Sequence, residues 1–261
     1  MQEYEVTSLK EFVEIVESLP SRFILSRGQS DDYNLLPSAL RKDLRGNRLY
    51  SNSTIKYFLD EFKINSVLYI DNLYSVENEY EWSLYAQHFG VPTKLLDFTY
   101  SHFVSLLFAV ENAFRYEDLE DKFAVVWFLD PLTLNNFSCN RREVVNISSK
   151  DCLDLSTKDY PIAICGKKIN NRINSQNGLF VYFQNDSIPL EELKCCNDIL
   201  IKIKIPYKNA RKILSTLYFM GMRLVNVYPE LSSISRDILL KNEIQQYLNE
   251  EGGLLEDVHE Y

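Results

Sequence analysis

The amino-acid sequence predicts an α+β fold: a helical N-terminal part packed on a mixed or antiparallel sheet, in a single domain over 1–261. Helical periodicity dominates the first 115 residues, and apolar, strand-like runs gather after residue 120 with helices between them. The chain shows no repeat, low-complexity tract or linker. A chain of 261 residues can bury the core that one such domain needs.

The helices of the first part are indicated by capping residues and apolar spacing. Ser8 and Glu11 form a capping box ahead of an apolar helical pattern. Gly90 suits a left-handed C-terminal cap, and Ser101 suits an N-cap. The helices expected here end at Pro20, span about 53–71 and 77–89, and follow Ser101, with a short helix after Pro37.

The strands are expected from apolar runs of strand length. The run 123–129 is continuous and rich in β-branched and aromatic residues, and 199–205 alternates isoleucine with leucine and lysine. A short buried strand over 22–26 is expected to end at Arg27 and Gly28. Further strands are expected over 94–99, 178–183 and 223–228, an irregular connection over 135–175, and helices over 208–220 and from Pro229 towards Leu248.

Composition and charge exclude several classes of function. The net charge of −9 argues against a general nucleic-acid binder, which needs a basic surface. The apolar run 104–110 is too short to span a bilayer, and the N-terminus lacks an apolar signal core, so we expect a cytoplasmic protein without a membrane partner. The five cysteines form no CxxC pair and no histidine lies at ligand spacing, so no metal site is expected.

Polar side chains concentrate where predicted strands stop, and Arg27 is the first of them. Its guanidinium either forms a structural ion pair with Asp31, Asp32 or Asp97, or binds a carboxylate or phosphate group of a ligand. Gly28 beside it lets the backbone turn or lets a ligand approach closely.

The stretch 84–100 holds a second group of polar residues. Asp97 could orient His88 as a general base, or His88 could simply hydrogen-bond near the C-terminus of its helix. Asp97 should face opposite to its two apolar neighbours, and Thr99 either caps the next helix or presents a hydroxyl to a ligand. Glycine-rich phosphate loops, zinc-protease motifs and the serine elbow are absent from the sequence.

Four segments together resemble the FRG domain, a bacterial and phage-associated family. They are "SRGQSDDYNLLPSALRK", "YAQHFGVPTKLLDFTYSHFVSLLFAVENA", "NNRINSQNGLFVYF" and "YFMGMRLVNVYPELSSISRDIL". The resemblance runs over about 22–239, which leaves the first helix and the last helix with its acidic tail as extensions. Ser26 stands where the naming phenylalanine would be, and Lys94 where an arginine is usual.

The order of these motifs is similar to that of the ADP-ribosyltransferases, which implies an ADP-ribosyltransferase-like fold with NAD as substrate. In that resemblance Arg27-Gly28 fills the first motif, Thr99 the hydroxyl of the second, and Gln176 the place where a glutamate is expected. Cleavage of the nicotinamide–ribose bond passes through an oxocarbenium-like state that a carboxylate stabilises. Asp97 or Glu230 would supply that charge, and the sequence does not choose between them.

The resemblance therefore implies an enzyme that processes NAD or a related nucleotide, in antiphage or toxin-like systems, with a protein as its target. Alternatively the same pocket binds a nucleotide without catalysis and signals to a partner, or Arg27, Asp97 and His88 form a buried structural network. No metal is implied. The candidate site residues are Arg27, Gly28, Gln29, Gln87, His88, Thr93, Asp97, Thr99, Arg172, Gln176 and Glu230.

Overall fold

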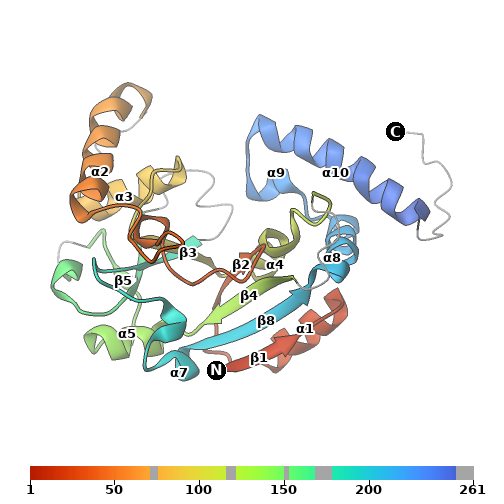
Figure 1. Cartoon of the computed structure of the whole chain (residues 1–261), viewed down its shortest axis with the longest axis horizontal. Coiled ribbons are helices and arrows are strands. Elements are labelled where there is room, and N and C mark those ends of the chain that lie inside the picture. Colours follow the sequence, from red (N-terminus) through yellow and green to blue (C-terminus); the bar gives the residue numbers. More distant parts are fainter. Residues whose placement is uncertain (71–75, 116–121, 150–152, 168–177, 251–261) are drawn as a thin grey trace.

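A mixed eight-stranded sheet forms the centre of the protein in the computed structural model, which describes residues 1–70, 76–115, 122–149, 153–167 and 178–250 (Figure 1). The strand order is β1-β8-β4-β2-β3-β7-β6-β5. The pairs β1–β8 and β5–β6 are parallel and the other neighbours are antiparallel. The strands span β1 Gln2–Glu5, β2 Leu25–Gln29, β3 Leu95–Thr99, β4 Phe123–Leu129, β5 Val145–Asn146, β6 Ile162–Cys165, β7 Gly178–Tyr182 and β8 Leu200–Pro206.

The helices begin where the capping residues indicate. The Ser8 hydroxyl accepts the backbone N–H of Glu11 at 3.3 Å, Ser101 accepts that of Val104, and Gly90 has a positive φ of 85°. The α-helices are α1 Leu9–Ser18, α2 Asn52–Ser66, α3 Glu79–His88, α4 His102–Val110, α5 Pro131–Cys139, α7 Cys196–Ile199, α8 Tyr207–Phe219, α9 Leu224–Val227 and α10 Leu231–Glu250. Short 3-10 turns span Ser38–Leu40, Val67–Tyr69, Leu155–Thr157 and Leu190–Glu192.

The sheet is buried on both faces, and β4 shows how. Alternate residues Ala124, Val126 and Phe128 lie in one hydrophobic cluster with residues of α1, α4 and α8. The intervening Val125, Trp127 and Leu129 lie in a second cluster on the opposite face. A strand covered on both faces needs a continuous apolar run, which is why 123–129 predicts its strand so well.

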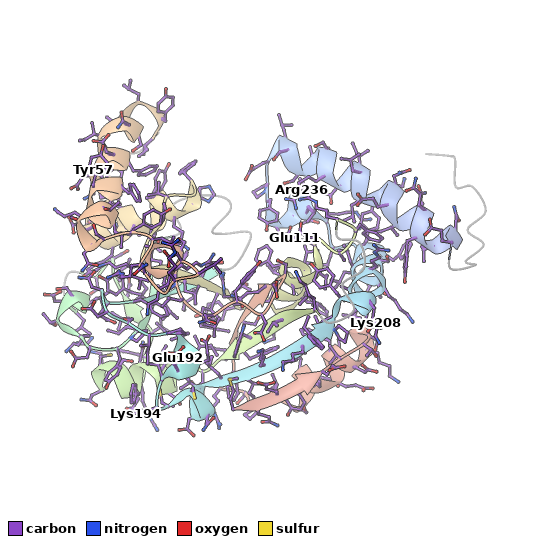
Figure 2. The ribbon with its side chains drawn as sticks, viewed as in Figure 1. Tyr57, Glu111, Glu192, Lys194, Lys208 and Arg236 are labelled. Carbon is purple, nitrogen blue, oxygen red and sulfur yellow. The ribbon has the colours of Figure 1, made fainter. Side chains whose placement is uncertain are left out.

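Helices α2 and α3 lie at one end of the sheet, and α9 and α10 at the other (Figure 1). The last helix is attached by an ion pair, because Arg236 Nη2 lies 2.9 Å from the carboxylate of Glu111, and Figure 2 shows both side chains near the end of α4. The Tyr228 hydroxyl donates to the same carboxylate at 3.2 Å. The fold is thus the expected α+β domain on a mixed sheet.

The expected end of the first strand at Arg27 and Gly28 is wrong, because β2 continues through both residues to Gln29. A Cβ atom on Gly28 would lie 1.7 Å from the backbone oxygen of Ser105 in α4. The glycine therefore lets a helix pack directly on the strand and makes no turn.

The expected strand over 223–228 is also wrong, since its centre forms the short helix α9. The carboxylate of Asp237 in α10 accepts the backbone N–H groups of Leu224 and Val225 at 2.8 and 3.0 Å. This tertiary cap stabilises a first helical turn that the apolar sequence does not predict. Strand β1 was not expected either, and it pairs in parallel with β8.

Candidate functional site

The sheet is locally open between β2 and β3, and Arg27 bridges the opening. Strands β2 and β3 pair in register at Ser26 and Thr99, whereas β2 pairs with β4 over its whole length. Beyond that point Arg27 Nη1 donates to the backbone oxygen of Asp97 at 2.9 Å and lies 2.8 Å from its Oδ1. The Arg27 side chain thus donates to the Asp97 backbone carbonyl in place of a backbone N–H group from a neighbouring strand.

The Arg27–Asp97 pair has a buried side and an open side. The Arg27 side chain is 15% exposed and the Asp97 side chain 48%. Arg41 lies near enough that Arg27 contributes, after burial, to lowering the pKa of the Arg41 guanidinium. The charge of Asp97 raises the pKa of the same guanidinium, so Arg41 lies within electrostatic range of the half-exposed carboxylate that Arg27 contacts directly.

The end of α3 is joined to Asp97 by amide and hydroxyl groups. Gln87 Nε2 donates to Asp97 Oδ1 at a long 3.5 Å, and Gln87 Oε1 accepts the hydroxyl proton of Thr93. His88 lies beside Gln87 in the same turn, and its ring meets that of Phe89 edge-on at 4.7 Å. Asp97 faces opposite to Leu96 and Phe98, which lie in the core, as expected.

Three of the candidate residues converge on one small cavity. Arg27, Asp97 and Thr99 line a hollow of about 30 Å³, which has room for about one water molecule. Its other walls are Ser26, Phe98, Phe108, Gly178 and Phe180. Strand β7 starts at this cavity, and the candidates Arg172 and Gln176, which precede β7, lie outside the described residues.

Other candidates lie away from this cavity. Gln29 is buried, and its Oε1 accepts the indole N–H of Trp127 at 3.1 Å. Glu230 lies just before α10, where its carboxylate accepts the Ser232 hydroxyl. Thr93 lines a different cavity near α2. Gly28 contacts α4, so the close approach it permits is that of a helix.

One polar group escaped the sequence reasoning. Ser26 Oγ lies 2.8 Å from both His102 Nδ1 and Ser105 Oγ, which joins β2 to α4. Burial lowers the pKa of His102, which favours the neutral imidazole. The signal available was Ser26 itself, a serine at the end of an apolar run, because a buried hydroxyl requires a hydrogen-bond partner.

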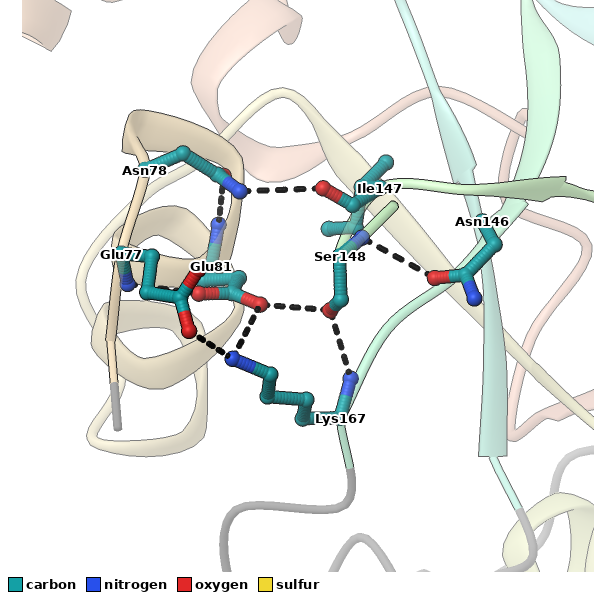
Figure 3. Close-up of polar contacts among 7 residues, drawn as sticks. All are labelled: Glu77, Asn78, Glu81, Asn146, Ile147, Ser148 and Lys167. Carbon is teal, nitrogen blue, oxygen red and sulfur yellow. Dashed lines mark hydrogen bonds and ion pairs between the residues drawn. The ribbon is translucent and has the colours of Figure 1, made fainter. Parts of the chain in front are cut away.

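A balanced network surrounds the fully buried carboxylate of Glu81 in α3 (Figure 3). It accepts the backbone N–H of Glu77 at 2.7 Å and the Ser148 hydroxyl at 2.5 Å, and Lys167 Nζ lies 3.8 Å away. Lys167 Nζ also lies 2.6 Å from Glu77, and its backbone N–H donates to Ser148 at 3.2 Å. The network ties α3 to the chain that follows β5 and β6.

Within the described residues, no three histidine, cysteine, aspartate or glutamate side chains are grouped so as to hold a metal ion. Over the same part of the chain, every helix is too short or too polar to cross a bilayer.

Comparison with known families gives one match. The family model described as the FRG domain matches residues 22–118, which include β2, α2, α3, β3 and α4. No curated protein and no solved structure matches the chain. Arg27, Gln87 and Asp97 thus all lie in the part of the chain that is similar to the FRG domain.

Proposed function

We propose that the opening between β2 and β3 binds a nucleotide of the NAD class and that the protein processes it in an ADP-ribosyltransferase-like reaction. The observation that carries this proposal is the convergence of Arg27, Asp97 and Thr99 on one cavity. The three strands that hold the corresponding motifs, β2, β3 and β7, are neighbours in the sheet. This adjacency supports the proposal because the motifs have to meet at one ligand.

The proposed reaction breaks the bond between the ribose C1′ and the nicotinamide nitrogen. The bonding electrons leave with nicotinamide, which becomes neutral, and water or a nucleophile of a target protein then adds to C1′ and loses a proton. A ligand phosphate competes with Asp97 for the Arg27 guanidinium. Once that exchange has occurred, the half-exposed Asp97 carboxylate is available to stabilise the cationic ribose.

Turnover of NAD by the purified protein tests this proposal directly. Nicotinamide release is expected from the unaltered protein, and Arg27→Ala or Asp97→Asn should reduce the rate by about 100-fold or more, as loss of a transition-state contact does. Arg45→Ala is the matched control, since Arg45 is exposed in a loop and does not line the cavity. Absence of turnover with NAD and with other nucleotides would refute the proposed enzymatic activity.

A non-catalytic nucleotide-binding module is the second candidate, with a signalling partner in place of a modified target. It is favoured by the two contacts that hold Arg27 on Asp97, because a carboxylate paired in this way is not available to stabilise a cationic ribose. It predicts that NAD raises the unfolding temperature without forming product. A role in antiphage defence or as a toxin is common to both proposals and derives from the family resemblance.

A further inference from the structure

Two basic side chains near the start of α2 have charges that no acidic neighbour among the described residues closely balances. We call the group around them the Arg48–Lys94 cluster, and it consists of Arg48, Asn52, Lys94 and Asn185. Arg48 Nη1 donates to Asn52 Oδ1 at 3.0 Å, and Lys94 Nζ donates to Asn185 Oδ1 at 3.2 Å. In the part of the chain that the structure describes, the side-chain hydrogen bonds of these two cations thus go to neutral amides.

The ion-pairing of the cluster is weak. Asp186 lies 3.9 Å from Arg48 Nη1, but its side chain is 97% exposed and free to move in water. Among the described residues, no carboxylate lies within 4.0 Å of Lys94 Nζ, which instead lies 5.3 Å from the ring centre of Tyr182. Partly buried cations with only weak counter-charges are costly, so an arrangement of this kind favours a ligand that balances them.

Two of the nitrogen atoms of the Arg48 guanidinium donate no hydrogen bond within the described structure. In the described part of the chain, its Nε and Nη2 are buried and have no hydrogen-bond partner. Unsatisfied buried donors are uncommon in folded proteins. Because both N–H groups are closed to solvent, a phosphate or carboxylate can bind them in a fork only after the guanidinium turns towards the cavity that Arg48 lines.

The cluster lies where two cavities meet. Lys94 and Asn52 line a cavity of about 430 Å³, and Arg48 lines another of about 710 Å³. Asn185 lines both. The first cavity also includes Ser53, in the first turn of the 15-residue helix α2, where free backbone N–H groups and the helix dipole favour an anion.

The environment of Lys94 agrees with an anion site. Burial, and after it the charge of Arg48, lowers the pKa of the Lys94 ammonium, while Glu79 raises it. Glu79 is itself paired with Lys63 at 3.4 Å and its side chain is mostly exposed. Each positive charge therefore makes the other less favourable, and an anion between them would relieve both.

We propose that the Arg48–Lys94 cluster binds the phosphate of a small organic phosphate monoester. The apolar part of the ligand lies along the wall that Ile55, Leu59 and Tyr182 form in the same cavity. This site is separate from the opening between β2 and β3 and does not depend on the proposed reaction there. Thr93 connects the two, because it lines the cavity and donates to Gln87, which contacts Asp97.

Binding of adenosine 5′-monophosphate, a soluble phosphate monoester with an aromatic part, tests the proposal by calorimetry and thermal unfolding. We expect saturable binding and a raised unfolding temperature for the unaltered protein, with weaker binding of inorganic phosphate. Adenosine, which lacks the phosphate, should not bind at this site. Sodium chloride at matched ionic strength serves as the control for general charge screening.

Variants locate the binding. Lys94→Gln and Arg48→Gln should each weaken binding of the monophosphate by about tenfold or more, and Lys94→Arg should retain it. The matched controls are Lys208→Gln, on α8 at the opposite end of the molecule (Figure 2), and Arg45→Gln in the loop before Arg48. If Arg48→Gln does not fold, the affinity of Lys94→Gln for the monophosphate alone decides whether the cluster is the binding site.

Three results would overturn the assignment of a binding site to the Arg48–Lys94 cluster, and a fourth would overturn the choice of an organic ester as its ligand. The first three are the absence of saturable binding, unchanged affinity in both Lys94→Gln and Arg48→Gln, and loss of binding in Arg27→Ala with retention in Lys94→Gln. The third result would place the ligand in the opening between β2 and β3. Equal affinity for inorganic phosphate and the monophosphate would reject the organic ester and leave a site for the free anion.

Discussion

The Glu81 network and the Arg48–Lys94 cluster both bury charge beside α3 and β3, yet they differ in how that charge is balanced. The carboxylate of Glu81 meets a backbone N–H, a hydroxyl and a lysine (Figure 3). Arg48 and Lys94 meet amide oxygens and a distant, exposed carboxylate. The first arrangement is complete, and the second has donors without acceptors.

This difference in charge balance distinguishes a part of the molecule that supports the fold, the Glu81 network, from a candidate binding site, the Arg48–Lys94 cluster. A buried charge whose hydrogen bonds are all made holds elements together, and removing one partner leaves the others unpaired. A buried charge with free donors stabilises little until a ligand arrives. The Arg27–Asp97 pair lies between these two cases, since its arginine is buried and its carboxylate half-exposed.

Removal of the Glu81 carboxylate should have the largest effect. Glu81→Ala leaves the Ser148 hydroxyl and the Glu77 N–H without their acceptor, and should lower the free energy of unfolding by about 3 kcal/mol. Urea unfolding followed by circular dichroism measures the change. Glu79→Ala, in the same turn but mostly exposed, is the control and should cost about 0.5 kcal/mol. Equal losses in both variants would show that the buried carboxylate of Glu81 stabilises the fold no more than the exposed carboxylate of Glu79.

Arg27→Ala should cost less, by about 2 kcal/mol, because the Asp97 backbone oxygen loses a donor while its carboxylate can still reach water. The same urea titration measures it. Arg27→Lys keeps the charge but not the fork, and should recover part of the loss. A loss as large as that of Glu81→Ala would make Arg27 purely structural and count against a ligand there.

His102, the first residue of α4, should contribute a smaller part of the stability, and this part should depend on pH. Burial lowers the pKa of His102 in the folded protein, so the unfolded chain binds its proton more readily. Stability is therefore complete above pH 6.5, the ordinary pKa of histidine, and falls as the pH drops below it. His102→Gln should flatten the difference between unfolding at pH 7.5 and pH 5.5. An unchanged slope would show that His102 is not the group responsible.

Lys94→Gln should change stability least, within about 0.5 kcal/mol in phosphate-free buffer, because loss of the contact with Tyr182 is offset by relief from Arg48. Thermal unfolding without phosphate measures this. Lys94→Gln and Glu81→Ala together compare the smallest and the largest loss of stability expected for the two regions. A loss of several kcal/mol would mean that Lys94 supports the fold as Glu81 does.

Prediction from sequence succeeded where the signal was local. The caps at Ser8 and Ser101, the strand 123–129 and the left-handed Gly90 follow from the spacing of neighbouring residues. It failed over 223–228, where a carboxylate thirteen residues away caps a helical turn in an apolar stretch. Propensity cannot register such a partner, because it depends only on nearby residues.

The sequence by itself determined the α+β class, most helices and strands, and which polar residues stand near strand ends. Only the tertiary structure decided that Arg27 pairs with Asp97 across the opening between β2 and β3, that Gly28 admits α4, and that Arg48 and Lys94 line two cavities that share Asn185. These contacts and cavities join residues far apart in the chain, and the energy of the contacts depends on burial and direction. Both appear only when the sheet has formed and the helices have packed on it.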